Sequence, residues 1–144
     1  MWNIALTNPV DTAEMELKTE TIQTSDTLIK TPGQNTTGGT DWENADNNEI
    51  QYPGLQENNQ QNHKLSENKI QNLESLGAET TAEKFNLPNI YIEIDVDSGS
   101  QTYTIGDETE LEEAETVIPI ERNAVTEENE DVKPVQLKIR TYQN

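Results

Sequence analysis

Residues 90–97 read Ile-Tyr-Ile-Glu-Ile-Asp-Val-Asp, an alternation of aliphatic and mostly acidic side chains. Successive side chains of a β-strand point to opposite faces, so this stretch predicts a half-buried strand with an acidic outer face. Ser98-Gly99-Ser100 is typical of a turn, and residues 102–105 predict the returning strand of a hairpin.

Two further stretches near the C-terminus have strand character. Residues 116–120 are rich in β-branched side chains, and Pro119 predicts that this strand lies at a sheet edge or contains a bulge. Val135, Leu137 and Ile139 alternate with polar residues and predict a last strand. Four strands within 88–144 predict a small antiparallel sheet or half-sandwich. Its apolar core is thin, so we expect it to be stabilised by docking or oligomerisation.

A short helix is predicted within residues 64–87, ahead of these strands. Ser66 is placed as its N-cap and Gly77 as the residue after its last turn. A further helical turn is expected over 80–85. The alternative to a single docked helix is a two-heptad coiled coil. A helix of about 12 residues is marginal in isolation and needs a surface to dock against. Its apolar face, which we expect to bind a partner, consists of Leu65, Ile70, Leu73 and Leu76.

Residues 31–63 are dominated by Asn, Gln, Gly and Thr, and Ile50 and Leu55 are their only aliphatic residues besides alanine. Such a composition predicts an extended linker or strap that cannot build a core. Trp42 and Tyr52 are the aromatic exceptions. We interpret them, together with Trp2, as anchors for a partner, because aromatic side chains supply much of the binding energy of interfaces. The alternative is a set of semi-exposed rings without a partner.

Residues 1–30 show no steady apolar period. Residues 14–19 alternate like a strand, so we expect an N-terminal arm with one or two short strands. The predicted fold class is therefore mostly β: a small C-terminal antiparallel sheet or half-sandwich (88–144), preceded by a short helical segment (64–87), a strap (31–63) and the arm (1–30).

Composition narrows the classes of function. The 144 residues include 28 acidic and 9 basic side chains, and the formal charge is −19. Direct nucleic-acid binding and adhesion to anionic membranes both need Lys and Arg, so neither is expected. There is no apolar run long enough to span a bilayer and no signal peptide, which favours a virion or cytoplasmic location. With one histidine and no cysteine, we expect no catalytic residues and no cofactor.

The sequence offers one candidate for a metal site. Asp95 and Asp97 precede a glycine turn, an arrangement that resembles the start of a calcium loop. The EF-hand pattern fails because Ser100 and Gly106 stand where glycine and a bidentate glutamate are required. An acidic outer strand face also explains both aspartates, so we expect no metal site here.

Two acidic runs, 106–115 and 127–131, lie between predicted strands. The structural interpretation of these runs is that they are solvated loops. The functional interpretation is that they form a negative surface directed at a basic partner. A nucleic-acid mimic would use acids in this abundance, but it would need a rigid scaffold rather than loops to hold their spacing.

We therefore expect a non-enzymatic structural or accessory subunit of a large assembly. A minor virion protein of the capsid-cement, connector or fibre-attachment type is the leading example, with its extended N-terminal part ordered by neighbouring protein subunits. The alternative is an acidic inhibitor that occupies the groove of a nucleic-acid-binding protein. A calcium-dependent adhesive module is a third hypothesis.

Overall fold

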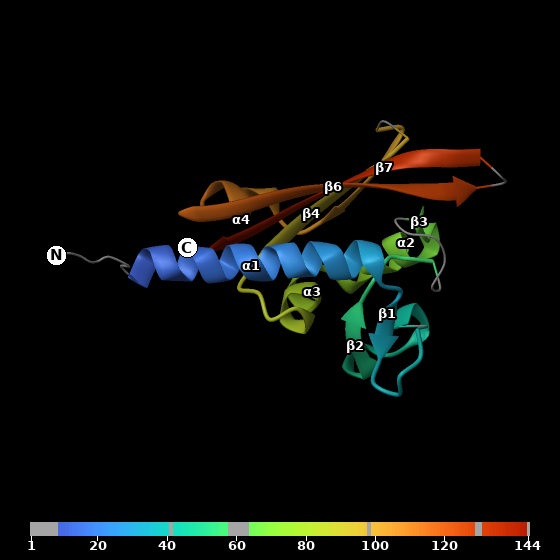
Figure 1. Ribbon diagram of the computed structural model, residues 1–144, viewed down its shortest axis with the longest axis horizontal. Helices are drawn as coiled ribbons and strands as arrows, with labels where there is room; N and C mark the ends of the chain where they lie inside the picture. The colour runs from blue at the N-terminus through green and yellow to red at the C-terminus, as the bar shows by residue number, and fades with distance from the viewer. Residues whose placement is uncertain (1–8, 41, 58–63, 98, 129–130, 144) are drawn as a thin grey trace.

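The computed structural model describes residues 9–40, 42–57, 64–97, 99–128 and 131–143. It contains about 40% strand and 37% helix. The expectation of a mostly β protein is therefore right only in part, because helices make up nearly as much of the chain. Figure 1 shows the long helix α1 (Pro9–Lys30) lying alongside a curled sheet, with the small β1–β2 sheet near its C-terminal end.

The main sheet has five strands in the order β3-β6-β7-β4-β5. The predicted hairpin is present as β4 (Ile90–Val96) and β5 (Gln101–Ile105). A longer hairpin consists of β6 (Thr116–Glu128) and β7 (Asp131–Gln143), and β7 pairs with β4. These pairings are antiparallel, whereas the two-residue β3 (Lys64–Leu65) runs parallel to β6 and pairs only with Val125 and Thr126. Pro119 thus lies on a stretch of β6 that is a sheet edge, as predicted.

The N-terminal segment forms α1 and not short strands. Its buried positions, from Leu17 to Ile29, recur with helical spacing, but half of them are Thr or Ser. These small polar side chains can be buried because their hydroxyls bond the preceding turn; Thr21 Oγ1, for example, donates to the Leu17 carbonyl at 2.6 Å. The hydrophobic period is therefore incomplete in the sequence. The buried residues are Leu17, Thr21, Thr24, Ser25, Leu28 and Ile29.

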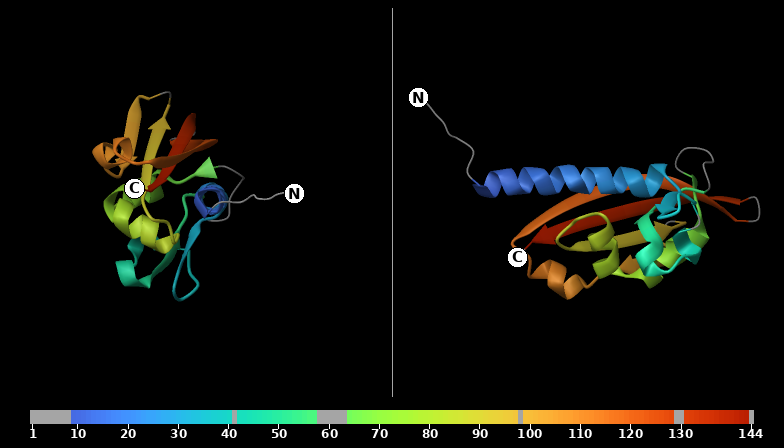
Figure 2. Two further views of the ribbon diagram at one scale, coloured as in Figure 1. Left: turned by 90° about the vertical axis from the view of Figure 1, so that its left-hand side faces the viewer. Right: turned by 90° about the horizontal axis from the view of Figure 1, so that it is seen from below.

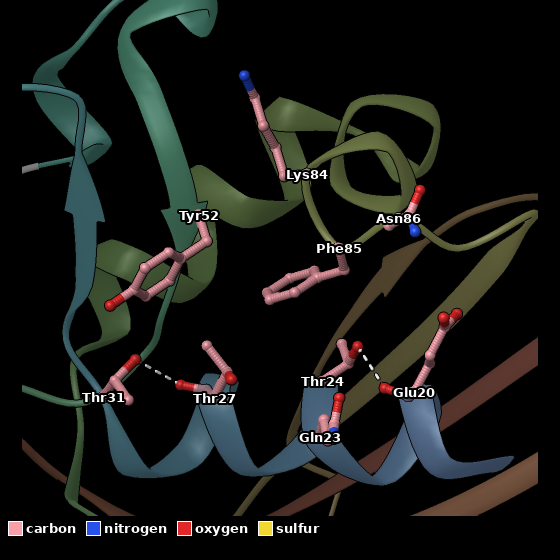
Figure 3. A pocket seen from close by; sticks show the side chains of 9 residues that line it. All are labelled: Glu20, Gln23, Thr24, Thr27, Thr31, Tyr52, Lys84, Phe85 and Asn86. Carbon is pink, nitrogen blue, oxygen red and sulfur yellow. Dashed lines mark hydrogen bonds between the residues drawn. The ribbon is translucent and has the colours of Figure 1, made fainter. Parts of the chain in front are cut away.

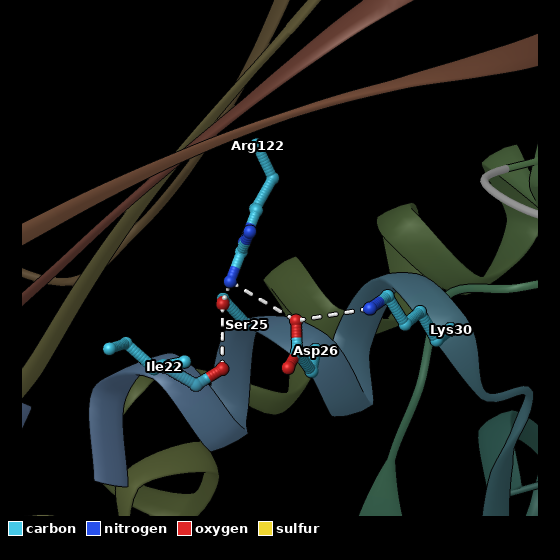
Figure 4. A network of polar contacts seen from close by, with 5 residues as sticks. All are labelled: Ile22, Ser25, Asp26, Lys30 and Arg122. Atoms are coloured by element: carbon cyan, nitrogen blue, oxygen red, sulfur yellow. Dashed lines mark hydrogen bonds and ion pairs between the residues drawn. The ribbon is translucent and has the colours of Figure 1, made fainter. Parts of the chain in front are cut away.

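Helix α1 is fixed to the sheet by a polar network (Figure 4). Arg122 of β6 points toward the helix, where its Nε donates to Ser25 Oγ at 3.0 Å and its Nη2 lies 3.1 Å from Asp26 Oδ1. Lys30 Nζ lies 3.7 Å from the same carboxylate oxygen. Arg122 and Asp26 are partly exposed, so their ion pair adds little to stability. We infer that the network mainly sets the orientation of α1 on the sheet.

Residues 31–57 are folded against the rest of the chain, which corrects the prediction of an extended strap. They form β1 (Gly33–Asn35), β2 (Ile50–Pro53) and the short 3₁₀ helices η1 (Trp42–Asn44) and η2 (Asn47–Glu49). The buried Lys69 holds this segment, since its Nζ donates to the Pro32 carbonyl at 2.7 Å and to the Gln56 carbonyl at 3.3 Å. A few specific contacts thus replace the missing aliphatic residues.

The predicted helix is present as α2 (Glu67–Leu76), and the expected further turn is α3 (Ala78–Lys84). Ser66 caps α2 as predicted, because its side chain accepts a hydrogen bond from the Lys69 amide. Gly77, with φ 89°, follows the last turn of α2. The surface on which α2 docks belongs to this chain, since Ile70 and Leu73 are fully buried in its core.

One hydrophobic core draws on every segment of the chain that the structure describes. It contains Leu28 from α1, Trp42 and Leu55 from the following segment, Leu73 from α2, and Ile92 from the sheet. Figure 2 shows α1, α2 and α3 on one side of the sheet. On the opposite face a smaller cluster joins Tyr91 and Tyr142 to Leu111 of α4 (Glu108–Glu112).

Candidate functional site

A cavity of about 730 Å³ lies at the end of the sheet where β4 begins and β7 ends. One wall is α3 and the segment that follows it, and the other is the start of α4 with the end of β7. The lining residues are Ala78, Glu79, Ala82, Glu83, Leu87, Pro88, Asn89, Ile90, Gly106, Asp107, Glu110 and Tyr142. Four of these are acidic and none is basic, so the charge of the lining is wholly negative.

The α3 wall presents two carboxylates above an apolar surface. Glu79 and Glu83 are one helical turn apart, so they lie on the same face of α3, and both are exposed. Ala78 and Ala82 precede them in the helix and also line the cavity. This wall therefore combines two charged side chains with two small apolar ones.

The opposite wall is held by the cap of α4. Asp107 is its N-cap, and Oδ1 of Asp107 accepts a hydrogen bond from the Thr109 amide at 2.9 Å. Gly106 brings this loop against the start of β4. Its φ is 121°, and a Cβ would lie 2.9 Å from the Ile90 carbonyl oxygen, so only glycine fits. Glu110, one turn into the helix, joins Asp107 at the rim.

Tyr142 links this wall to the sheet. Its ring is buried, while its hydroxyl donates to Glu110 Oε2 at 3.2 Å. Burial raises the pKa of the Tyr142 phenol, and the hydrogen bond to Glu110 and the charges of Glu110 and Asp107 raise it further. The negative charges of the cavity therefore favour the neutral form of this phenol.

The acids of this cavity are spread around its rim. Among the residues that the structure describes, no group of three or more Asp, Glu, His or Cys side chains is arranged to hold a metal ion. Separate carboxylates beside apolar side chains suit Lys or Arg side chains, whose aliphatic stems pack on apolar surface while their charged ends stay at the rim.

The two acidic runs lie partly on regular structure and not only in the loops that the sequence predicts. Half of the first run, Glu108–Glu112, is in α4, and in the second run Glu127 lies in β6 and Asp131 in β7. Of the first run, Asp107 and Glu110 face the cavity. We did not predict from the sequence that Glu79 and Glu83 belong to this site. Two acids at helical spacing beside two alanines are a sequence pattern that could have indicated it.

The proposed aromatic anchors have different environments. Trp42 is buried in the core, and its Nε1 donates to the Gly54 carbonyl at 2.8 Å. Tyr52 is half-buried and lines a second cavity of about 420 Å³ between α1, β2 and α3. Figure 3 shows its ring and that of Phe85 facing this cavity above the threonines of α1. Both Glu20 and Lys84 line it, so it lacks the one-sided charge of the first cavity. Trp2 lies outside the described residues.

The apolar face of α2 and its flanks is turned inward. Leu65, Ile70 and Leu73 are fully buried, and Leu76 packs against the same core. In the structure these side chains are core residues and form no exposed partner surface.

The calcium candidates are occupied by contacts within the chain. Asp95 lies on the outer face of β4, where Oδ2 is 3.6 Å from Lys138 Nζ and Oδ1 accepts a hydrogen bond from Thr102 Oγ1 at 2.9 Å. Asp97, with φ 56°, opens the turn of the hairpin and accepts a hydrogen bond from Ser100 Oγ at 3.4 Å. Both carboxylates therefore have partners in the hairpin, and Asp95 also has one in β7.

Comparison with protein-family models, with curated proteins and with solved structures finds no match for this chain. No described helix has both the length and the apolar character required to cross a bilayer.

Proposed function

We propose that this chain is a non-enzymatic interaction protein whose acid-lined cavity binds a basic segment of a partner protein. The observation that carries the proposal is the lining of the cavity, which has four carboxylates and no basic side chain. A neutral ligand would leave these charges unpaired, whereas a Lys- or Arg-rich segment would pair them.

The partner class that we propose is a nucleic-acid-binding protein, one of whose Lys- and Arg-rich segments would enter the cavity. Such segments pair with the negative charge of phosphates. Glu79 and Glu83 lie on α3, Asp107 is the N-cap of α4 and Glu110 lies in α4, so packed elements hold the spacing of these acids. An acidic inhibitor that replaces nucleic acid needs such a scaffold, because acids in loops cannot hold a fixed spacing. Charge complementarity would also speed the encounter of the two proteins.

The proposal is tested by calorimetric titration with a 12-residue peptide of alternating Lys and Ala. The Glu79→Gln, Glu83→Gln double variant is expected to bind about tenfold more weakly than the wild type at low salt, because two rim charges are lost. Binding by the wild type is expected to weaken steeply between 50 and 300 mM NaCl.

The matched control is the Glu16→Gln, Glu49→Gln double variant, which removes the same charge at two exposed sites outside the cavity. It should bind the peptide within about twofold of the wild type. Equal losses for the two double variants would show that only net charge matters, and the proposal would then be wrong.

An accessory subunit of a large assembly, such as a virion, is the second candidate. It rests on the small size, the Thr-, Asn- and Gln-rich β sequence and the lack of cysteine, and the extended N-terminal part that it includes is folded against the rest of the chain over residues 9–57. What favours it now is the exposure of two large apolar side chains, Met15 on α1 (66%) and Val132 near the tip of the β6–β7 hairpin (63%). Docking through such side chains would survive high salt, whereas binding of a basic segment in the cavity would not.

A further inference from the structure

The outer edge of β6 is unpaired by any described strand over most of its length, and α1 packs against β6 on the helix side of the sheet. At one end of the strand β3 covers Val125 and Thr126, but no described strand pairs with residues 116–124 on this side. At the other edge of the sheet, a backbone donor of β5 is satisfied by a side chain, since the Thr104 amide donates to Glu74 Oε2 at 3.2 Å. The edge of β6 is thus the main unpaired edge of the described sheet.

The pairing of the strands identifies which backbone groups face outward. The Asp97 amide donates to the Pro134 carbonyl, so the backbone of Pro134 faces β4 and not β6. Its partner Val125 therefore directs its own amide and carbonyl away from β7, toward β3. Because this direction alternates along a strand, the outward groups on the open stretch are those of Val117, Pro119, Glu121 and Asn123.

We propose that this edge pairs with the same edge of a second copy, in antiparallel orientation about a two-fold axis at Ile120. Residue i of one copy then faces residue 240 − i of the other. Val117 pairs with Asn123 of the second copy, and Pro119 pairs with Glu121. Because Pro119 has no amide hydrogen, this register forms six backbone hydrogen bonds across the interface.

The neighbouring registers are worse. Shifting the axis to Glu121 places the two copies of this carboxylate directly opposite each other, which is destabilising. Shifting it to Pro119 pairs two residues that lack amide hydrogens, and only four hydrogen bonds remain over the open stretch. An axis at Ile120 avoids both defects and places the half-buried Ile120 side chains in contact on the helix side of the sheet.

Local charge also favours a second copy at this edge. Although the chain carries a charge of −19, Pro119 pairs with Arg140 and Glu121 with Lys138 on β7, and Arg122 lies on β6 itself. Three of the nine basic residues therefore lie at or directly behind the open stretch. Arg122 is paired with Asp26 and Lys138 with Asp95, so these residues reduce the self-repulsion of the edge and do not attract the second copy directly. Val117, 38% exposed, adds apolar surface beside it.

The first test is sedimentation velocity of the full chain from 5 to 500 µM. We expect a monomer–dimer equilibrium whose dissociation constant falls as NaCl rises from 50 to 500 mM, because screening weakens the repulsion between two acidic chains. This salt response is opposite to that of the basic peptide, so the two proposals can fail separately. A monomer under all of these conditions would overturn the inference.

The second test locates the interface. Asn123→Pro removes an outward amide hydrogen without breaking the ladder to β7, and it deletes two of the six hydrogen bonds. We expect it to weaken dimerisation at least about tenfold, whereas Asn123→Ala, which keeps the amide, should stay within about threefold of the wild type. A dimer equally stable in both variants would place the interface elsewhere and overturn the inference.

Amide hydrogen exchange of the wild-type chain gives the same information without substitution. The amides of Val117, Glu121 and Asn123 should exchange rapidly at 5 µM and become protected at 500 µM. Those of Ile118, Ile120 and Arg122, which bond β7, should be protected at both concentrations. Rapid exchange of the three outward amides at 500 µM would contradict the proposed pairing.

Discussion

Two buried tyrosines mark the contact between α4 and the outer face of the sheet. The rings of Tyr91 and Tyr142 pack with Leu111, and both phenols lie close to acidic side chains. Burial is the main cause that raises the pKa of Tyr91, and the charges of Glu108 and Glu93 add to it, against a smaller opposing effect of Arg140. Both phenols are therefore held in the neutral form more firmly in the folded chain than in the unfolded one.

This pKa difference predicts how stability depends on alkaline pH. The folded state keeps its phenolic protons above pH 10.0, the ordinary pKa of tyrosine, whereas the unfolded state loses them. The stabilisation is fully present below that pH and is lost as the pH rises through the folded pKa values, so the free energy of unfolding should fall. Urea unfolding at pH 8 to 11 should show a smaller fall for Tyr91→Phe, Tyr142→Phe than for the wild type. Equal slopes would contradict the assigned environment.

At the level of single residues, sequence reasoning succeeded where the side chain has a local role and failed where its partner is distant. Ser66 was placed correctly because an N-cap bonds within its own helix turn. The sequence did not indicate the structural role of Lys69, because the carbonyls to which it donates belong to the distant residues Pro32 and Gln56. The sequence predicts an anchor at Trp42 because its own segment offers few side chains to cover it, whereas in the structure it is buried in the core.

The small sheet of β1 and β2 depends on the close approach of two glycines. Gly33 and Gly54 pack against each other beside the Trp42 ring, and a Cβ on Gly54 would overlap the Gly33 amide nitrogen and the Thr31 carbonyl oxygen. These atoms belong to the backbone, so they cannot move aside without separating the strands. The sheet therefore requires glycine at position 54 for steric reasons.

We predict that Gly54→Ala lowers the free energy of unfolding by about 1–3 kcal/mol, the usual cost of overpacking. Gly39→Ala is the matched control, because its nearest neighbour is the side chain of Asn35 at 3.2 Å, which can shift. Its effect should be less than about 0.5 kcal/mol. Urea unfolding curves monitored by Trp fluorescence provide the measurement, and equal stability of the two variants would contradict this packing.

At the level of elements, the sequence predicts those helices and strands in which apolar residues recur at every expected position. The strand over residues 90–96 and helix α2 show clear alternation or helical spacing and were placed with small errors at their ends. Helix α1 was missed because Thr21, Thr24 and Ser25 occupy core positions that usually hold aliphatic residues. The sequence predicts a loop in place of helix α4 because this helix has a single buried residue, Leu111, and its other side chains are mostly acidic.

At the scale of the whole molecule, the acidic cavity depends on folding and could not be read from either acidic run. Glu79 and Glu83 are separated from Asp107 and Glu110 by two strands of the sheet, and only the packing of α3 and α4 at one end of that sheet brings them together. The sequence indicated that charge would matter and that the partner would be basic. It did not indicate which of the 28 acidic residues share a surface.

The central claim is that a basic segment binds in this cavity and not on the acidic surface at large. The most direct measurement is a ¹⁵N–¹H correlation spectrum of the full chain during titration with the Lys-Ala peptide. We expect the largest shift changes at the amides of Glu79, Glu83, Asp107, Glu110 and Tyr142, with saturation at a one-to-one ratio. Small changes distributed over all acidic segments, or changes centred on the ends of the β6–β7 hairpin, would contradict the account.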